Sequence, residues 1–261
     1  MLGRRLPLHI HISTLFVLLI LVVGGLLGWL AYQHSRQLLE RSADDMTVRI
    51  NREMAAAVDR LVGPAEMAVD LLAYKRLTLA SSLDERLQHL AYLQTTLSGS
   101  TALTAIYAGY DNGDFFPLRR FTDENERAMF AAPAGCVYVV QSIEQAQAPP
   151  RGRYLFLDAR LNPLRIEEQP GYPGRFDPRQ RPWYLKARAV DGPVKTAPYL
   201  FFSNRRVGMT LAAPAAKGQA VVGADILLET LGDSLARQKV TSRSQALLAN
   251  ADSIKADLVA V

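Results

Sequence analysis

The sequence predicts an α+β protein in which helices come first and an antiparallel sheet with flanking helices follows. Two observations support this fold class. Apolar residues recur at helical spacing before residue 100, whereas alternating and β-branched runs separated by turn residues dominate from residue 103 to residue 227. Strands and helices do not alternate regularly along the chain, so a parallel sheet built from βαβ units is not expected.

Composition limits the classes of function. The chain has 261 residues, which is room for one or two domains, and a net charge of +5. Its arginines are scattered, whereas nucleic-acid binding needs a clustered basic face, so no nucleic-acid partner is expected. The single cysteine, Cys136, excludes an internal disulfide and a cysteine-based metal site. We interpret it as a small buried apolar residue.

Residues 12–32 carry no charge, and almost all of them are apolar. A helix of about 20 residues spans a hydrocarbon core of roughly 30 Å, so we predict a transmembrane helix over this range. Trp29 and Tyr32 lie where interfacial aromatic residues are usual. The partner predicted for this segment is the cell membrane.

The orientation follows from the basic residues beside the span. Arg4 and Arg5 precede it, so the positive-inside rule predicts a cytoplasmic N-terminus over 1–11 and a periplasmic or extracellular location for the rest of this single-pass chain. Arg36 and Arg41 follow the span closely and weaken this asymmetry.

A long stalk helix is predicted over 33–80, interrupted by a kink or break at Gly63-Pro64. Its apolar residues follow an 11-residue period, which keeps one stripe on a nearly straight helix. The stripe either covers the core of its own domain or packs against a twin helix that carries movement to the membrane; both can hold. Gly24 and Gly28 in the predicted transmembrane span form a Gly-x-x-x-Gly pair, and together with the apolar stripe they suggest a homodimer. The period is marked by Leu39, Ile50, Leu61 and Leu72.

The remaining elements follow from caps, alternation and turns. A capping box at Ser82–Glu85 opens a shorter helix that ends near Ser98. Strands are predicted at 103–110, 115–118, 136–142, 153–158, 199–202, 207–214 and 220–227, with turns at 111–114 and 217–219 and helices at 123–130, 183–189 and 229–239.

The stretch Phe176–Tyr184 contains two prolines, which bias Asp177 and Arg181 toward extended backbone. In an extended run, Arg181 and Trp183 share one face and Tyr184 lies on the other. A guanidinium beside an indole can bind a carboxylate through two hydrogen bonds while the ring packs against the apolar part of a ligand. Alternatively, the aromatic residues fill a core and the arginine pairs with a protein carboxylate.

Three short motifs occur here in one order: Asp177–Tyr184, then Pro198-Tyr199, then Val221–Asp225. Together they resemble the double Cache sensor domains of bacterial chemoreceptors, cyclases and histidine kinases. The resemblance covers roughly 37–239. It implies a PAS-like antiparallel sheet with flanking helices, a Cache lobe, over 81–239.

The resemblance also implies a binding site. In the amino-acid-binding branch of these sensors, residues matching Arg181, Trp183 and Tyr184 contact the carboxylate of the ligand. A residue matching Asp225 holds the ammonium group, and one matching Tyr199 lines the pocket. Asp225 has another interpretation, as a strand-end residue that caps the following helix.

Two positions depart from that branch. Phe176 stands where the branch has a tyrosine, and Phe201 stands where it has an aspartate. Loss of one anion near the amine site weakens the case for a free amino acid. A carboxylate ligand with a more apolar body, or an amine, fits equally well.

Catalysis is not expected. The four histidines form no metal-binding motif, and no phosphate-binding glycine loop or nucleophile elbow is present. Asp111–Asp114 resembles a calcium loop but reads better as a tight hairpin turn. We therefore predict no enzyme activity, no cofactor and no metal, although a nucleotide or diguanylate cyclase domain could follow in a full-length relative.

These observations predict a membrane-anchored extracytoplasmic sensor for transmembrane signal transduction, with a small organic ligand such as an amino acid, an amine or a carboxylate. The alternative is a structural remnant of a larger receptor or cyclase that binds no ligand and acts by dimerising with related chains. Residues 240–261 resemble the start of an incomplete second lobe.

Overall fold

The computed structural model describes residues 8–230 and residue 232. The chain divides into two compact units, 1–55 and 56–261. In the first unit, the described residues are helical throughout. The predicted helix over 229–239 lies mostly outside the described residues, and the predicted second-lobe start over 240–261 lies wholly outside them.

Helix α1 spans Leu8–Ala73 and includes Pro64, so the helix is not broken at Gly63-Pro64, where the sequence suggested a kink or a break. It ends before the predicted limit of residue 80. Within the part of the chain that the structure describes, no helix combines the length and the apolar character needed to cross a membrane. Of the predicted stripe, Leu72 is fully buried. The side chains of Leu39, Ile50 and Leu61 lie outside the described residues.

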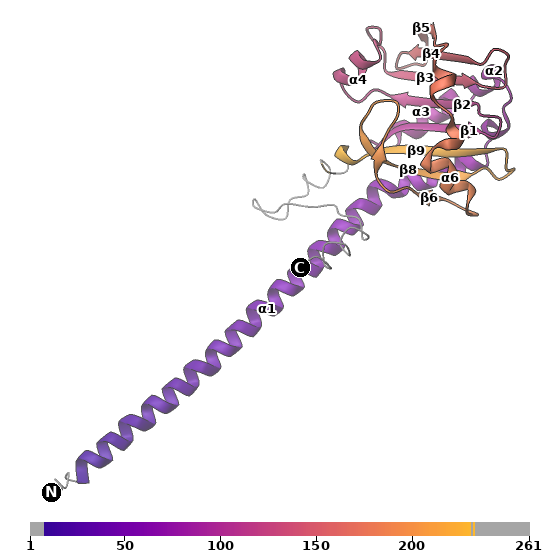
Figure 1. Cartoon of the computed structure of the whole chain (residues 1–261). Helices are drawn as coiled ribbons and strands as arrows, with labels where there is room; N and C mark the ends of the chain where they lie inside the picture. Colours follow the sequence, from indigo (N-terminus) through magenta and orange to yellow (C-terminus); the bar gives the residue numbers. More distant parts are fainter. Residues whose placement is uncertain (1–7, 231, 233–261) are drawn as a thin grey trace. The chain divides into compact units, whose positions relative to one another are not determined.

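The second unit contains an antiparallel sheet, which the described residues build from nine strands in the order β5-β4-β3-β2-β1-β9-β8-β6, with β7 also paired to β8 (Figure 1). The α+β class and the antiparallel sheet predicted from the sequence are therefore confirmed. The strands are β1 Leu103–Tyr110, β2 Phe115–Arg120, β3 Tyr138–Glu144, β4 Arg151–Leu157, β5 Pro163–Glu168, β6 Val194–Lys195, β7 Tyr199–Leu200, β8 Val207–Pro214 and β9 Ala220–Leu227.

Short helices connect and cover the strands. The Ser82 side chain accepts a hydrogen bond of 3.3 Å from the Glu85 amide, as the predicted capping box requires, but the helix that it opens soon ends and a second one begins. The helices after α1 are η1 Arg76–Leu79, α2 Leu83–Leu87, α3 Leu90–Ser98, α4 Glu124–Met129, α5 Tyr172–Arg175, η2 Pro178–Gln180 and α6 Pro182–Arg188.

Both faces of the sheet are covered. Along β1, Ile106 and Tyr110 point into a core shared with the end of α1 and with α3, because alternate residues of a strand face opposite sides. Ala105 and Tyr107 point into a second, aromatic core that lies against α5 and α6. The central strands β1 and β9 are therefore buried along their whole length.

A buried ion pair joins α2 to the turn between β1 and β2. Arg86 is fully buried, and its Nη2 donates a 2.6 Å hydrogen bond to Oδ2 of Asp114. Its guanidinium lies 4.2 Å from the centre of the Tyr110 ring. The other oxygen of Asp114 accepts hydrogen bonds from the amides of Gln145, at 2.6 Å, and Ala146, at 3.2 Å. The Arg86–Asp114 pair thus connects α2, the turn between β1 and β2, and the loop that follows β3.

A candidate ligand-binding pocket

The aromatic face of the sheet encloses a cavity of about 230 Å³. This volume is below the range of pockets for drug-sized molecules and suits a small metabolite. Strands β1, β2, β3 and β9 form one wall, and the segment between α5 and β8 forms the other. The cavity is lined by Tyr107, Phe115, Pro117, Arg119, Gln141, Tyr172, Phe176, Arg181, Pro182, Trp183, Tyr199, Leu200, Phe201, Phe202, Ser203 and Asp225.

The sheet register brings two charged residues of the wall together. Ala105 on β1 pairs with Arg119 on β2 and with Asp225 on β9. Directly paired residues of neighbouring strands point to the same face, so Arg119 and Asp225 flank the small Ala105 side chain on the pocket side. Thr210 on β8 pairs with Asp225 and extends the row.

Asp225 lies within β9 and is 5% exposed, and its carboxylate contacts residues of β1, β2 and β8 instead of capping a helix. Its Oδ1 accepts hydrogen bonds from the hydroxyls of Tyr107, at 2.7 Å, and Thr210, at 2.8 Å. Its Oδ2 lies 3.5 Å from Nη2 of Arg119. Burial raises the pKa of the Asp225 carboxyl above its ordinary value, and the contacts with Arg119, Tyr107 and Thr210 oppose that rise.

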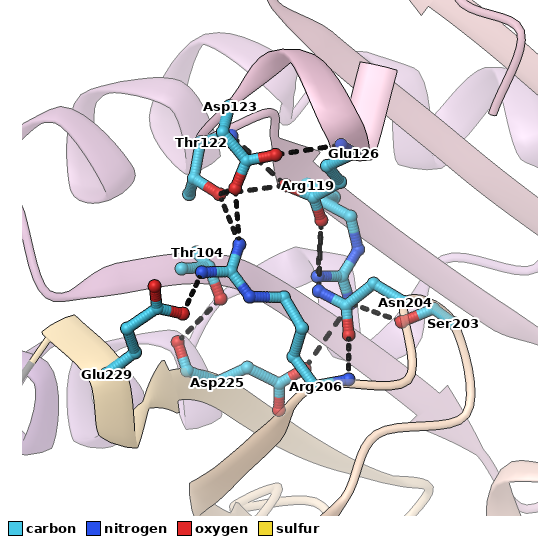
Figure 2. Close-up of polar contacts among 10 residues, drawn as sticks. All are labelled: Thr104, Arg119, Thr122, Asp123, Glu126, Ser203, Asn204, Arg206, Asp225 and Glu229. Atoms are coloured by element: carbon cyan, nitrogen blue, oxygen red, sulfur yellow. Dashed lines mark hydrogen bonds and ion pairs between the residues drawn. The ribbon is translucent and has the colours of Figure 1, made fainter. Parts of the chain in front are cut away.

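Arg119 links this carboxylate to a second one (Figure 2). Its Nη2 donates a 2.7 Å hydrogen bond to Ser203, and its Nη1 lies 3.6 Å from Oε1 of Glu126. Glu126 also accepts a 3.0 Å hydrogen bond from Asn204, so the loop after β7 is tied to α4. Within the described residues, Nε and Nη1 of Arg119 have no hydrogen-bond partner, although the side chain is buried.

Arg181 supplies the other positive charge of the lining. Its guanidinium packs against two neighbouring phenyl rings, 4.5 Å from the centre of Phe176 and 4.9 Å from that of Phe202, whose centres are 5.4 Å apart. A cation held over ring faces is attracted by them and keeps N–H groups available for hydrogen bonds. Nη2 donates a long hydrogen bond of 3.4 Å to the Arg175 carbonyl, and the buried Nε has no partner among the described residues.

The proline-rich stretch is less extended than the sequence suggests. Asp177 and Arg181 have extended backbone as predicted, but a 3-10 turn separates them and Pro182 begins α6. The predicted extended run through Tyr184 is therefore wrong, because the tryptophan and tyrosine belong to a helix, although Arg181 and Trp183 do line the cavity and Tyr184 does not. Trp183 lines the cavity, with its ring 4.8 Å from that of Tyr107.

Tyr184 lies outside the lining. Its hydroxyl donates a 2.5 Å hydrogen bond to Asp111 in the β1–β2 turn. Tyr199 lies at the wall, with its hydroxyl 2.7 Å from that of Thr210, and its ring packs 5.1 Å from Phe201. Of the residues carried over from the sequence resemblance, the cavity thus brings together all but Tyr184: Phe176, Arg181, Trp183, Tyr199, Phe201 and Asp225.

Sequence reasoning missed Arg119, Gln141 and the aromatic residues on β1 and β2. One signal was present: Phe115, Pro117 and Arg119 alternate along β2, which puts them on one face. A buried arginine on that face needs a partner carboxylate, but the sequence does not show which strand lies next to β2.

Proteins related in sequence include a cyclase and chemotaxis receptors. Adenylate cyclase 1 of Rhizobium meliloti is 30% identical over 243 residues, which cover 92% of this chain and 36% of that protein. The methyl-accepting chemotaxis protein McpB of Bacillus subtilis is 36% identical over 78 residues, 30% of this chain and 12% of that protein. PctB of Pseudomonas aeruginosa is 37% identical over 62 residues, 23% of this chain and 10% of that protein. The chain thus spans about a third or less of the length of these relatives.

Among solved structures, the ligand-binding domain of the chemoreceptor PctB in complex with L-Arg is 21% identical and covers 73% of this chain and 60% of that domain, with a TM-score of 0.45. No protein-family model matches the sequence.

Proposed function

We propose, starting from the premise that the chain is a Cache-type sensor domain, that it binds a small carboxylate-bearing molecule in the pocket between the sheet and α6. The chain acts as an input domain rather than as an enzyme. An aromatic-lined cavity with a cationic group at its wall suits an organic anion with an apolar body.

The observation that carries this proposal is the state of Arg181. Its guanidinium packs against two aromatic rings, and its buried Nε has no partner among the described residues. A buried N–H without an acceptor is costly, and a ligand carboxylate supplies one through charge-assisted hydrogen bonds. The lining itself offers one carboxylate, that of Asp225, which already has three other partners.

Replacement of Arg181 by alanine is expected to abolish ligand binding and to keep the fold. The purified chain in detergent is heated alone and with amino acids, amines and small carboxylates. A bound ligand at about 100 times its Kd adds roughly 2.7 kcal/mol to the free energy of unfolding, which raises the Tm by several degrees. The Arg181→Ala variant should unfold cooperatively without any such rise, because the carboxylate has lost its main partner.

Tyr184→Phe is the matched control, since it removes a neighbouring hydroxyl that points to Asp111 and away from the pocket. This variant should keep the rise in Tm caused by the ligand. An unchanged affinity in Arg181→Ala would place the ligand elsewhere. A sharp transition that no compound shifts, already in the unsubstituted chain, would favour the structural role without a ligand.

We also propose that residues 12–32 anchor the chain in the inner membrane as a homodimer, with 1–11 in the cytoplasm and 81–239 in the periplasm. The uncharged sequence of this range and the arginines before it support this. The chain should remain in membranes after an alkaline carbonate wash, and a protease added to spheroplasts should digest residues 81–239. Release by the wash would contradict the anchor, and protection from the protease would contradict the orientation.

A further inference from the structure

The carboxylate of Asp225 is already engaged by the protein. Two hydroxyls donate to its Oδ1, and its Oδ2 faces the guanidinium of Arg119 at 3.5 Å. A ligand ammonium drawn to Asp225 would have to lie beside that guanidinium. Two cations sharing one buried carboxylate repel each other strongly, because the interior screens charges poorly.

The two guanidiniums of the lining differ in their partners. Arg119 lies between two buried carboxylates, with its Nη2 3.5 Å from Asp225 and its Nη1 3.6 Å from Glu126. Arg181 makes no ion pair among the described residues, and its Nη2 donates only to the Arg175 carbonyl. Arg181 is therefore the cation that a ligand carboxylate can neutralise, whereas the charge of Arg119 is already compensated.

Both guanidiniums also have free N–H groups. The Nε atoms of Arg119 and Arg181 are buried and lack hydrogen-bond partners within the described part of the chain, whereas Nη1 of Arg119 faces Glu126 at 3.6 Å. Arginine donates and never accepts, so each Nε–H calls for an acceptor atom on the ligand. An ammonium group donates only, so it would leave the Nε–H of Arg119 unpaired. A hydroxyl or keto oxygen would accept from it.

We propose that Arg119 determines the class of ligand by engaging Asp225 and presenting its own Nε–H donor. The pocket then selects 2-hydroxy and 2-oxo acids over the corresponding amino acids. These acids are monocarboxylates with a neutral oxygen on the carbon next to the carboxylate. This inference rests on the proposed function, because it assumes that Arg181 binds the carboxylate. Arg119 is thus a specificity-determining residue within the same site.

The test compares compounds that differ in one substituent. Alanine is paired with lactate, leucine with 2-hydroxy-4-methylpentanoate, and phenylalanine with phenyllactate, and each compound is titrated into the whole chain in detergent while heat is measured. For the pair whose body fits the cavity, the hydroxy acid should bind about tenfold or more tightly than the amino acid. Tighter binding of the amino acid would overturn the inference and leave the proposed function intact. Binding of none of the six compounds would overturn both.

Substitution of Arg119 should reverse the preference. Arg119→Gln frees Asp225 for an ammonium, so the amino acid should gain affinity relative to its hydroxy acid until the ratio reaches one or inverts. The double variant Arg119→Gln/Glu126→Gln removes one positive and one negative charge from the same buried cluster. It is used for the same affinity ratio if the single variant does not fold. An unchanged ratio in a folded variant would show that Arg119 does not select the ligand.

Arg206→Gln is the control for the polar network. Arg206 belongs to the same set of contacts, through hydrogen bonds to Asp123, at 2.8 Å, and Thr122, at 2.9 Å, but it does not line the cavity (Figure 2). Its loss perturbs the surrounding loop without altering the charge beside Asp225. The ratio should therefore stay that of the unsubstituted chain. A ratio that moved equally in Arg206→Gln and Arg119→Gln would assign the effect to the loop and overturn the inference.

Discussion

Replacement of Arg86 by methionine is expected to lower the free energy of unfolding by about 3–5 kcal/mol, because it leaves the carboxylate of Asp114 buried without its cation. Both side chains are almost fully buried, at 0% and 3% exposure. Methionine preserves most of the volume, so the loss reports the charge and not a cavity. Urea unfolding followed by circular dichroism measures it.

A matched double variant separates the two parts of this loss. In Arg86→Met/Asp114→Asn the unpaired charge is removed, while the asparagine oxygen can still accept from the amides of Gln145 and Ala146. Since buried ion pairs can be replaced by neutral groups at small cost, the double variant should recover much of the lost stability. If Arg86→Met lowered the free energy of unfolding by less than about 1 kcal/mol, the pair would behave as an exposed ion pair. That result would contradict its burial in the structure.

Replacement of Trp183 by alanine is expected to cost about 3–5 kcal/mol and also to abolish ligand binding. Trp183 is 3% exposed and packs against Tyr107 and Phe115, with ring centres 4.8 and 6.3 Å away. Truncation removes an indole from the aromatic core and opens the wall of the cavity. Unfolding in urea and ligand titration measure the two effects separately.

Leu185→Ala is the control on the same helix, because Leu185 is 59% exposed and should change stability by less than about 0.5 kcal/mol. The contrast with Arg181→Ala is also informative. The sequence groups Arg181 and Trp183 in one motif, but we expect different roles: we propose that the arginine binds the ligand carboxylate, whereas the tryptophan also belongs to the aromatic core. A Trp183→Ala variant as stable as Leu185→Ala would contradict that assignment.

The sequence predicted best three strands whose ends coincide with turn residues. The limits of β1, β8 and β9 agree with the predicted ranges, because an apolar run bounded by turn residues determines a strand without knowledge of its neighbours. Strand β5 was missed because every residue in it is exposed and several are charged. Charge on an edge strand protects it from pairing with other chains and hides the apolar alternation.

The site was predicted in part for a similar reason. Proline-flanked residues such as Arg181 and Trp183 form a local motif that can be read along the chain. Arg119 contributes through its register with Asp225 across an intervening strand, and register is a property of the assembled sheet. Tyr184 was placed with the pocket residues because the resemblance carried it over beside Trp183, whereas its hydroxyl binds Asp111 in the β1–β2 turn.

Strand β1 is a wall common to both cores. Tyr107 lines the pocket on one face, and three residues later the Tyr110 hydroxyl donates a 2.7 Å hydrogen bond to the Leu77 carbonyl beneath the other face. Close-packed interiors transmit small displacements instead of absorbing them. We therefore expect occupancy of the pocket and the arrangement of the helices under the sheet to be linked by a coupling free energy. Such a coupling is reciprocal. If the ligand changes the equilibrium between two helix arrangements by some factor, a partner that binds one of those arrangements should change ligand affinity through the same coupling.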